Sequence, residues 1–160
     1  MVEHVLRRMG FGASAADVAF YGDLSPVALV NTLLDFERVP DDVDAFIGQP
    51  DFAGITTRGQ FQPNTVIGDA RQRWLFRMIH TRRPLQEKLA LFWHNHFSTA
   101  YRKINGALGS VHATKAMDGR ASEVAGGARG HIQLFRDLAA GNFRDLLVEV
   151  RAVSVNPVDT

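Results

Sequence analysis

The chain has 160 residues, 46% of them hydrophobic and 22% charged, a balance typical of one soluble globular domain with a real core. Its net charge of +1 gives no overall field that would select nucleic acid or an anionic membrane, and the absence of cysteine excludes disulfides, thiolate zinc sites and a cysteine nucleophile. No apolar run approaches the ~18 residues that a membrane-spanning helix needs. We therefore predict a single domain over residues 1–160, with no nucleic-acid partner and no membrane span.

The first third of the chain carries two clear helix starts. Ser14 is predicted to cap a helix that has Asp17 at its third position, and Ser25 is predicted to cap the next helix, with Pro26 in its first turn. A short helix over residues 3–9 precedes both and stops at the Gly-Phe-Gly run that follows it.

Loops of unusual length separate the later helices. Residues 48–68 are rich in glycine and proline and are predicted to be a loop, and two helices follow in succession over 69–80 and 85–97. Residues 105–130 are predicted to be weak helix and loop, and a last helix covers 142–153. Because alternation with a period of two appears nowhere, the fold class is predicted to be all-α, an irregular multi-helix bundle with long Gly-rich loops.

The stretch LQEKLALFWHNHF over residues 85–97 raises the question of whether His94 and His96 form one site. On a helix that turns ~100° per residue, two side chains that are two positions apart do not face each other. His96 falls within the apolar stripe of Leu89 and Phe92 and is predicted to be buried or half-buried, while His94 points the opposite way and is predicted to be exposed or at an interface. We favour the interpretation that His96 is a core histidine. The alternative is that it belongs to a ligand-binding site.

Six large side chains are predicted to be core because they follow helical apolar stripes: Trp74, Leu89, Phe92, Trp93, Phe97 and Leu147. No two histidines have the four-residue spacing of a zinc-binding helix, so no metal and no cofactor are predicted. The acidic group Asp41, Asp42 and Asp44 lacks the spacing of an EF-hand and indicates the first turn of a helix instead.

A basic stripe marks the helix over residues 69–80. Arg73, Arg77 and His80 share one face, and Arg82 and Arg83 follow directly. Such a cluster of guanidinium groups could hold a phosphate, sulfate or carboxylate. The alternative is a solvated helix face whose last turn carries cations that suit the helix dipole.

Three motifs together resemble the DUF1800 family of bacterial proteins of unknown function. A His-x-Leu-x-Arg-x-Gly-Phe-Gly pattern is matched from His4 to Gly12, a Phe-Trp-His-Asn-His-Phe run is matched from Phe92 to Phe97, and a Gly-Asn-Phe-Arg-Asp-Leu-Leu run is matched from Gly141 to Leu147. The resemblance covers most of residues 3–150, and the middle motif is the specific one.

The resemblance implies a largely helical protein that is often exported and often encoded beside a DUF1501 protein of sulfatase-like character. It supplies no catalytic residues. By the same resemblance, family members are much longer and commonly exported. We recognise no signal peptide at the start of this sequence, and its last residues depart from the usual Asp-Pro-Ala-Met continuation. We therefore expect residues 1–160 to be the N-terminal fragment of a longer architecture, and the localisation stays open.

Two functions from different classes follow from these observations. The first is a non-catalytic helical module that binds a partner or assists export, with a DUF1501-type protein as the partner that the resemblance implies. The alternative is an enzyme or ligand-binding domain that uses His94, His96 and the Arg71–Arg83 region with a metal or anionic ligand. A homo-oligomer in which exposed apolar helices pair is a third possibility.

Overall fold

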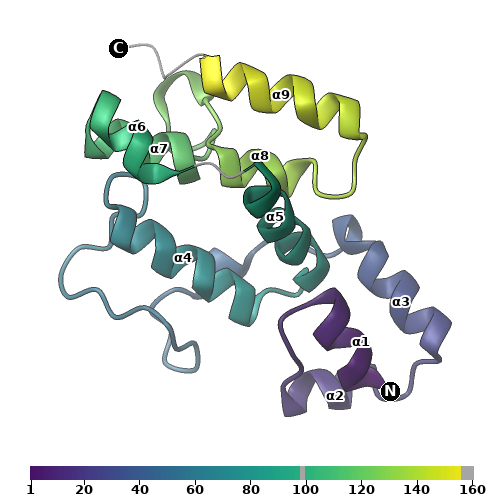
Figure 1. Ribbon diagram of the computed structural model, residues 1–160. Coiled ribbons are helices and arrows are strands. Elements are labelled where there is room, and N and C mark those ends of the chain that lie inside the picture. The colour runs from purple at the N-terminus through teal and green to yellow at the C-terminus, as the bar shows by residue number, and fades with distance from the viewer. Residues whose placement is uncertain (98–99, 156–160) are drawn as a thin grey trace.

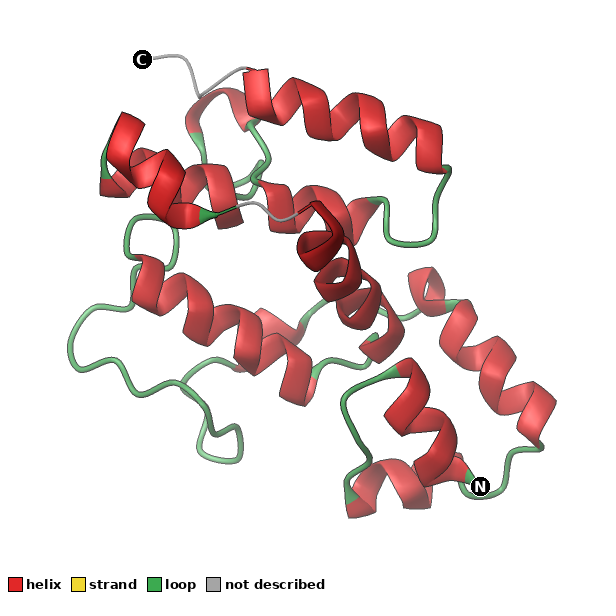
Figure 2. Cartoon of the chain, viewed as in Figure 1, coloured by secondary structure: helices red, strands yellow, loops and turns green. Residues whose placement is uncertain are grey.

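The computed structural model describes residues 1–97 and 100–155, and these residues form helices and loops without a strand (Figure 2). The predicted all-α class is confirmed. Within these ranges, no helix combines the length and apolarity needed to cross a membrane. The α-helices are α1 (Val2–Met9), α2 (Ala15–Tyr21), α3 (Pro26–Leu34), α4 (Ile67–His80), α5 (Pro84–Phe97), α6 (Tyr101–Leu108), α7 (Ser110–Asp118), α8 (His131–Asp137) and α9 (Phe143–Val155). Short 3-10 turns are η1 (Phe36–Arg38), η2 (Val43–Phe46) and η3 (Ala125–Gly127).

Helices α1 to α3 form a small N-terminal cluster beside the rest of the chain (Figure 1). Both predicted helix starts are confirmed. Ser14 and Asp17 form a reciprocal capping box, in which the Ser14 Oγ accepts from the Asp17 amide at 3.1 Å and Asp17 accepts from the Ser14 amide at 2.8 Å. The Ser25 Oγ accepts from the Ala28 amide at 3.2 Å, and Pro26 occupies the first turn of α3. The buried side chains of this cluster are Val2, Leu6, Tyr21, Leu29 and Leu33.

Helix α5 lies at the centre, where α1, α3, α4 and α8 pack around it (Figure 1). Its two ends contribute to different apolar clusters. Leu85 packs with Phe36 and Ala139, whereas Ala90 packs with Phe135 and Leu146. Both clusters are small. Much of the interface between α4, α5 and α8 is therefore formed by polar side chains.

A long segment without helix precedes α4 over residues 47–66, where a loop over residues 48–68 was predicted. Polar side chains of α4 hold it in place. Asp69 accepts from the Thr57 hydroxyl at 2.5 Å and from the Gln62 amide at 2.9 Å, and Gln72 accepts from the Thr56 amide at 2.6 Å. The loop therefore has fixed anchor points despite its lack of secondary structure.

The region of residues 105–130 is more helical than predicted. It contains the second half of α6 and all of α7 and η3, and it is followed by α8, a helix that was not predicted from the sequence. Gly109, with φ of 80°, separates α6 from α7 without a longer loop. The Gly130 amide donates to the Gly119 carbonyl at 2.8 Å, which closes the connection between α7 and α8.

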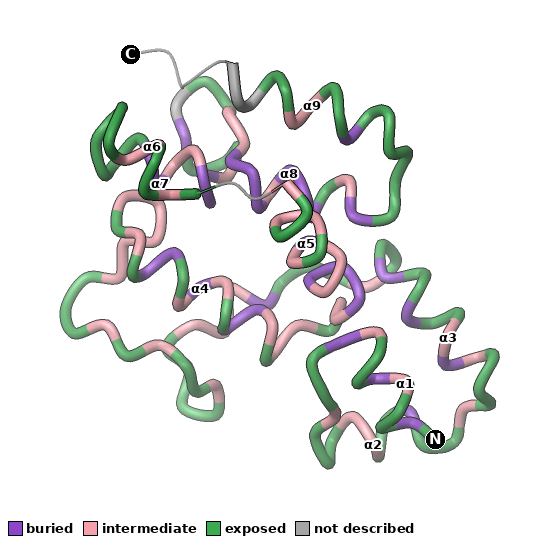
Figure 3. Tube along the Cα trace, in the orientation of Figure 1, coloured by how far each residue is buried: buried purple, intermediate pink, exposed green. Residues whose placement is uncertain are grey.

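Two of the six predicted core residues are wrong. Phe92 and Leu147 are 55% and 44% exposed, and Figure 3 shows α9 green along most of its length. Leu89, Trp93 and Phe97 are partly buried against the core, and Trp74 is half-buried. Helix α9 packs through the neighbouring stripe of Leu146, so Leu147 remains on its outer face.

Candidate functional site

Two arginines of α4 are buried, which contradicts the solvated face that the sequence favoured. Arg73 is 2% exposed and Arg77 is 1% exposed. A buried guanidinium must be paired, because an unpaired charge in the protein interior is very costly. Both guanidinium groups point into the protein and bind internal carboxylates, so neither is free to hold an anionic ligand.

Glu87 of α5 is the centre of this pairing and is fully buried. Its Oε1 accepts from Arg77 Nε at 2.7 Å and from Arg136 Nε at 2.7 Å, and its Oε2 accepts from Trp74 Nε1 at 3.0 Å. One carboxylate on α5 thus ties α4 to α8. Burial alone would raise the pKa of Glu87, but the charges of Arg136 and Arg77 hold it below its ordinary value.

Arg77 also reaches the acidic group around the start of η2. Its Nη1 donates to Asp44 at 2.9 Å and its Nη2 donates to Asp41 at 2.5 Å, while Arg120 donates to the same Asp44 oxygen. Asp41 and Asp44 therefore face an internal arginine. The acidic run lies at the start of the 3-10 helix η2, as its sequence indicated, with Asp42 at the N-cap and Asp44 in the first turn. We call the whole set the charge network: Arg73, Arg77, Arg120 and Arg136 with Asp41, Asp44, Glu87, Asp118 and Glu123.

Arg73 anchors the other end of the network to α7. Its Nε and Nη2 donate to the Asp118 Oδ2 at 3.0 and 2.8 Å, and its Nη1 donates to Glu123 at 2.8 Å. The side chain of Asp118 is 2% exposed, and burial raises the pKa of this carboxyl although Arg73 opposes the effect. The second oxygen of Asp118, Oδ1, is buried and has no hydrogen-bond partner.

The remaining predicted basic residues are also engaged. His80 Nε2 lies 2.7 Å from the Ala53 carbonyl oxygen, Arg82 donates to Asp42 at 3.2 Å, and Arg83 Nε donates to the Val39 carbonyl at 2.6 Å. The five basic groups of this stretch bind parts of the chain itself. The structure does not bring Arg73, Arg77 and His80 together at a surface site.

The two histidines of α5 point in different directions, as predicted, but the predicted exposures are reversed. His96 is exposed and stacks on Phe92, with ring centroids 6.1 Å apart. His94 is half-buried with its ring edge against Trp74 at 5.3 Å. The buried face of α5 runs through Gln86, Glu87 and Ala90 because the charge network lies on that side. Phe92 and His96, at the C-terminal end of the predicted apolar stripe, therefore face outward, whereas Leu89 packs against the core.

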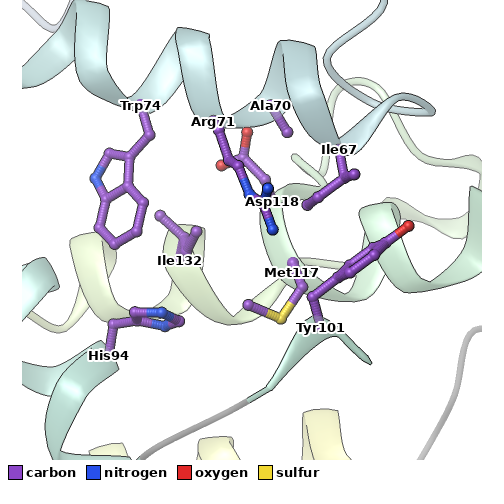
Figure 4. A pocket seen from close by; sticks show the side chains of 9 residues that line it. All are labelled: Ile67, Ala70, Arg71, Trp74, His94, Tyr101, Met117, Asp118 and Ile132. Carbon is purple, nitrogen blue, oxygen red and sulfur yellow. The ribbon is translucent and has the colours of Figure 1, made fainter. Parts of the chain in front are cut away.

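His94 takes part in a cavity of about 190 Å³ that lies between α4, α5, α6, α7 and α8 (Figure 4). Trp74, Met117 and Ile132 form apolar walls, and Arg71, His94 and Asp118 add polar groups. Two of the predicted regions, the arginines of α4 and the histidines of α5, thus meet here through Arg71 and His94. Arg73, Arg77, His80 and His96 are not part of the lining.

The imidazoles near this cavity favour their neutral forms. Burial lowers the pKa of His94, whose Nδ1 is buried and has no hydrogen-bond partner. Burial also lowers the pKa of His131, with a further contribution from the neighbouring His94. A neutral imidazole offers one ring nitrogen as a hydrogen-bond acceptor.

Within residues 1–97 and 100–155, no group of three or more His, Asp or Glu side chains is placed to bind a metal ion. Glu87, Asp118 and Arg136 belong to the charge network but were not predicted as site residues from the sequence. Glu87 stood on a helix in an apolar context, which is a usable signal. Asp118 and Arg136 gave none, because their partners are 45 and 49 residues away in the chain.

A comparison with protein families matches residues 4–154 to the family described as "Protein of unknown function (DUF1800)". The match spans nearly the whole chain and agrees with the three motifs found in the sequence. No curated protein and no solved structure matches the chain.

Proposed function

Because the chain belongs to the DUF1800 family, whose description states no activity, we propose a function from its geometry: it is a non-catalytic helical module that binds a partner protein. The binding surface consists of Phe92 and Trp93 on α5 and Phe143 and Leu147 on α9. We call these four residues the apolar surface. The exposure of Phe92, Phe143 and Leu147 is the observation that carries the proposal.

The apolar surface is continuous. The rings of Phe92 and Trp93 are 4.9 Å apart, and Trp93 stacks on Phe143 at 5.7 Å. Leu147 follows Phe143 by one helical turn. Phe92 is 55%, Phe143 49% and Leu147 44% exposed. Exposed aromatic side chains grouped in this way are typical of protein-binding sites, where a few of them supply most of the affinity.

The pattern of α9 supports the same proposal. Its apolar stripe is wider than the face that the rest of the chain covers, since Leu146 is buried and Val150 is half-buried while Phe143 and Leu147 stay exposed. In Figure 1, α9 lies at the outer edge of the molecule with α8 beneath it. An amphipathic helix of a partner fits such a surface, because its side chains at every third and fourth position can pack against the aromatic rings.

The engagement of the charged candidates also favours a binding role over a catalytic one. Arg73 and Arg77 hold internal carboxylates, and His94 and His96 do not face a common point. The DUF1501-type protein implied by the family resemblance is the partner we propose. An enzyme of that kind could dock one of its surface helices on α5 and α9.

The test measures binding between the purified full protein and its DUF1501-type neighbour by calorimetry. The double variant Phe92→Ser, Leu147→Ser is expected to lose at least about tenfold in affinity, since buried aromatic anchors contribute 2 kcal/mol or more at interfaces. Phe20→Ser is the matched control. Phe20 is 75% exposed but lies on α2, away from the apolar surface, and its loss should leave the affinity unchanged.

A photo-crosslinking amino acid placed at position 92 or 147 identifies what occupies the surface in cells. An adduct with the DUF1501-type protein supports the proposal. An adduct with a second copy of the chain would contradict the proposal and show that the apolar surface mediates self-association. If the purified pair shows no binding, or the double variant binds as well as the unaltered chain, the proposal is wrong.

A further inference from the structure

A second feature of the molecule, separate from the apolar surface, is the cavity beside His94. Its volume of about 190 Å³ exceeds the ~150 Å³ of a cavity that takes up benzene. Trp74, Met117 and Ile132 provide apolar walls from three different helices, and Figure 4 shows their side chains around one space with Arg71, Asp118 and His94. The room suits a small organic molecule with an apolar part.

The buried carboxylate in this lining lacks a donor. Asp118 binds Arg73 through Oδ2, whereas Oδ1 is buried and unpartnered. Arg73 already serves two carboxylates, Asp118 and Glu123. The triad of Arg73, Asp118 and Glu123 contains one positive and two negative charges, and Glu123 is its exposed member. A hydrogen-bond donor with a positive charge would satisfy Oδ1 and balance the triad at once.

Arg71 supplies the opposite charge to the same cavity. It is exposed, and no carboxylate of residues 1–97 and 100–155 lies within ion-pairing distance of its guanidinium. The other lining groups are apolar or hydrogen-bonding side chains. A free guanidinium is a preferred partner of a carboxylate, which it can bind through two parallel hydrogen bonds.

From these groups we propose that the cavity binds a free α-amino acid with an uncharged side chain. The ammonium group donates to Asp118 Oδ1, and the carboxylate accepts from Arg71. The side chain lies against Trp74, Met117 and Ile132. His94, on the opposite wall in Figure 4, offers an acceptor to a side chain that carries a donor. A peptide bond on either end of the amino acid would remove one of the two charges that the cavity recognises.

The test titrates the full protein with L-leucine and L-glutamine by calorimetry. N-acetyl-L-leucine, which lacks the ammonium group, and L-leucinamide, which lacks the carboxylate, are run beside them. Saturable binding of at least one free amino acid is expected. If leucine binds, each of its two derivatives should bind at least about tenfold more weakly. If only glutamine binds, the same comparison is made with the N-acetyl and amide derivatives of glutamine.

Variants then assign each charge to its residue. Arg71→Gln should weaken the free amino acid at least about tenfold but leave the affinity for its amide unchanged, because the amide makes no use of the guanidinium. Arg102→Gln removes the same charge from an exposed position on α6 outside the cavity, and it should change nothing. Asp118→Asn should abolish discrimination against the N-acetyl derivative. Arg71 is exposed, so its variant folds even if Asp118→Asn does not.

Absence of saturable binding by both amino acids, equal affinities for the free and derivatised forms, or an unchanged affinity in Arg71→Gln would each overturn the proposal. The double variant of the apolar surface should bind the amino acid normally. The two proposals can therefore fail separately.

Discussion

Glu87 illustrates how much of this fold depends on single residues. Its carboxylate is fully buried and accepts hydrogen bonds from Arg77, Arg136 and Trp74. Removing one partner from a buried ion pair leaves the other charges uncompensated.

Glu87→Gln is therefore expected to lower the free energy of unfolding by about 3–5 kcal/mol, measured by urea denaturation. Glu149→Gln is the matched control. Glu149 pairs with Arg129 at 3.2 Å, but both side chains are substantially exposed, so the loss should stay within about 1 kcal/mol. Equal losses in the two variants would show that Glu87 is not the centre of the network.

His94 is half-buried and His131 is buried near the cavity, and both imidazoles predict that the free energy of unfolding depends on pH. Burial lowers the pKa values of His94 and His131 below the ordinary value of 6.5, so the unfolded chain takes up protons more readily than the folded chain. The free energy of unfolding should therefore fall as the pH is lowered through about 6.5.

The measurement is urea denaturation at a series of pH values from 7.5 to 5.5, a range set by the ordinary histidine pKa of about 6.5. His94→Gln should flatten the dependence, and His112→Gln, which changes an exposed histidine, should preserve it. Parallel curves for the unaltered chain and His94→Gln would contradict this assignment.

At the residue scale, the sequence predicted the directions of His94 and His96 relative to each other but reversed their burial. Helical spacing fixes relative directions on one helix. Which face of the helix is buried depends on the elements that pack against it. In α5 the face that carries the ion-paired Glu87 is buried and Phe92 is exposed, so the apolar stripe alone does not identify the buried face. Ion pairs between residues that are 45 or more positions apart, such as Arg73 with Asp118, leave no local pattern.

Helix ends are the elements that the sequence predicted best, because a cap involves residues only three positions apart. Ser25 caps α3 through the Ala28 amide. Ser25→Ala should lower the free energy of unfolding by ~1 kcal/mol, whereas Ser122→Ala, at an exposed turn, should have little effect. Chemical denaturation compares the two, and an unchanged stability of Ser25→Ala would mean that the cap contributes nothing.

The joint between α7 and α8 depends on a close backbone approach. A methyl group on Gly130 would lie 2.6 Å from the Gly119 nitrogen and 2.6 Å from the Lys115 carbonyl oxygen, and both are backbone atoms that cannot turn aside. Gly130→Ala should cost at least about 1–3 kcal/mol.

Gly106→Ala is the control for this prediction, since nothing lies within 4 Å of the added carbon and Gly106 sits within α6. That variant should leave stability unchanged or raise it by about 0.5–1 kcal/mol. Thermal unfolding distinguishes the two, and a Gly130→Ala protein as stable as the unaltered chain would show that the joint can relax.

The limits of prediction at the element scale have a physical cause. The helix α8 was missed because its seven residues include His131, Gln133 and Arg136, which give no amphipathic stripe. Its helical form follows from tertiary contacts, namely Phe135 in the core and Arg136 on Glu87. Long amphipathic segments such as α5, by contrast, were predicted within one or two residues of their observed ends.

At the scale of the whole molecule, the charge network joins elements that the apolar clusters leave apart. Arg77 of α4 reaches the acidic run at the start of η2 and Glu87 of α5, and Arg73 reaches Asp118 of α7. Arg136 brings α8 to the same carboxylate of α5. The all-α class was predictable from periodicity. The network was not, because arginine and carboxylate side chains spread along a sequence resemble a solvated surface.

The central claim is that the buried arginines of α4 stabilise the fold and that Arg71, on the same helix, does not. The most direct measurement is the free energy of unfolding of Arg77→Gln and Arg71→Gln by urea denaturation. Arg77→Gln is expected to lose about 3–5 kcal/mol and Arg71→Gln less than about 0.5 kcal/mol. If Arg77→Gln is as stable as Arg71→Gln, Arg77 is not bound within the protein as described here, and the case against a surface site for an anionic ligand on α4 fails with it.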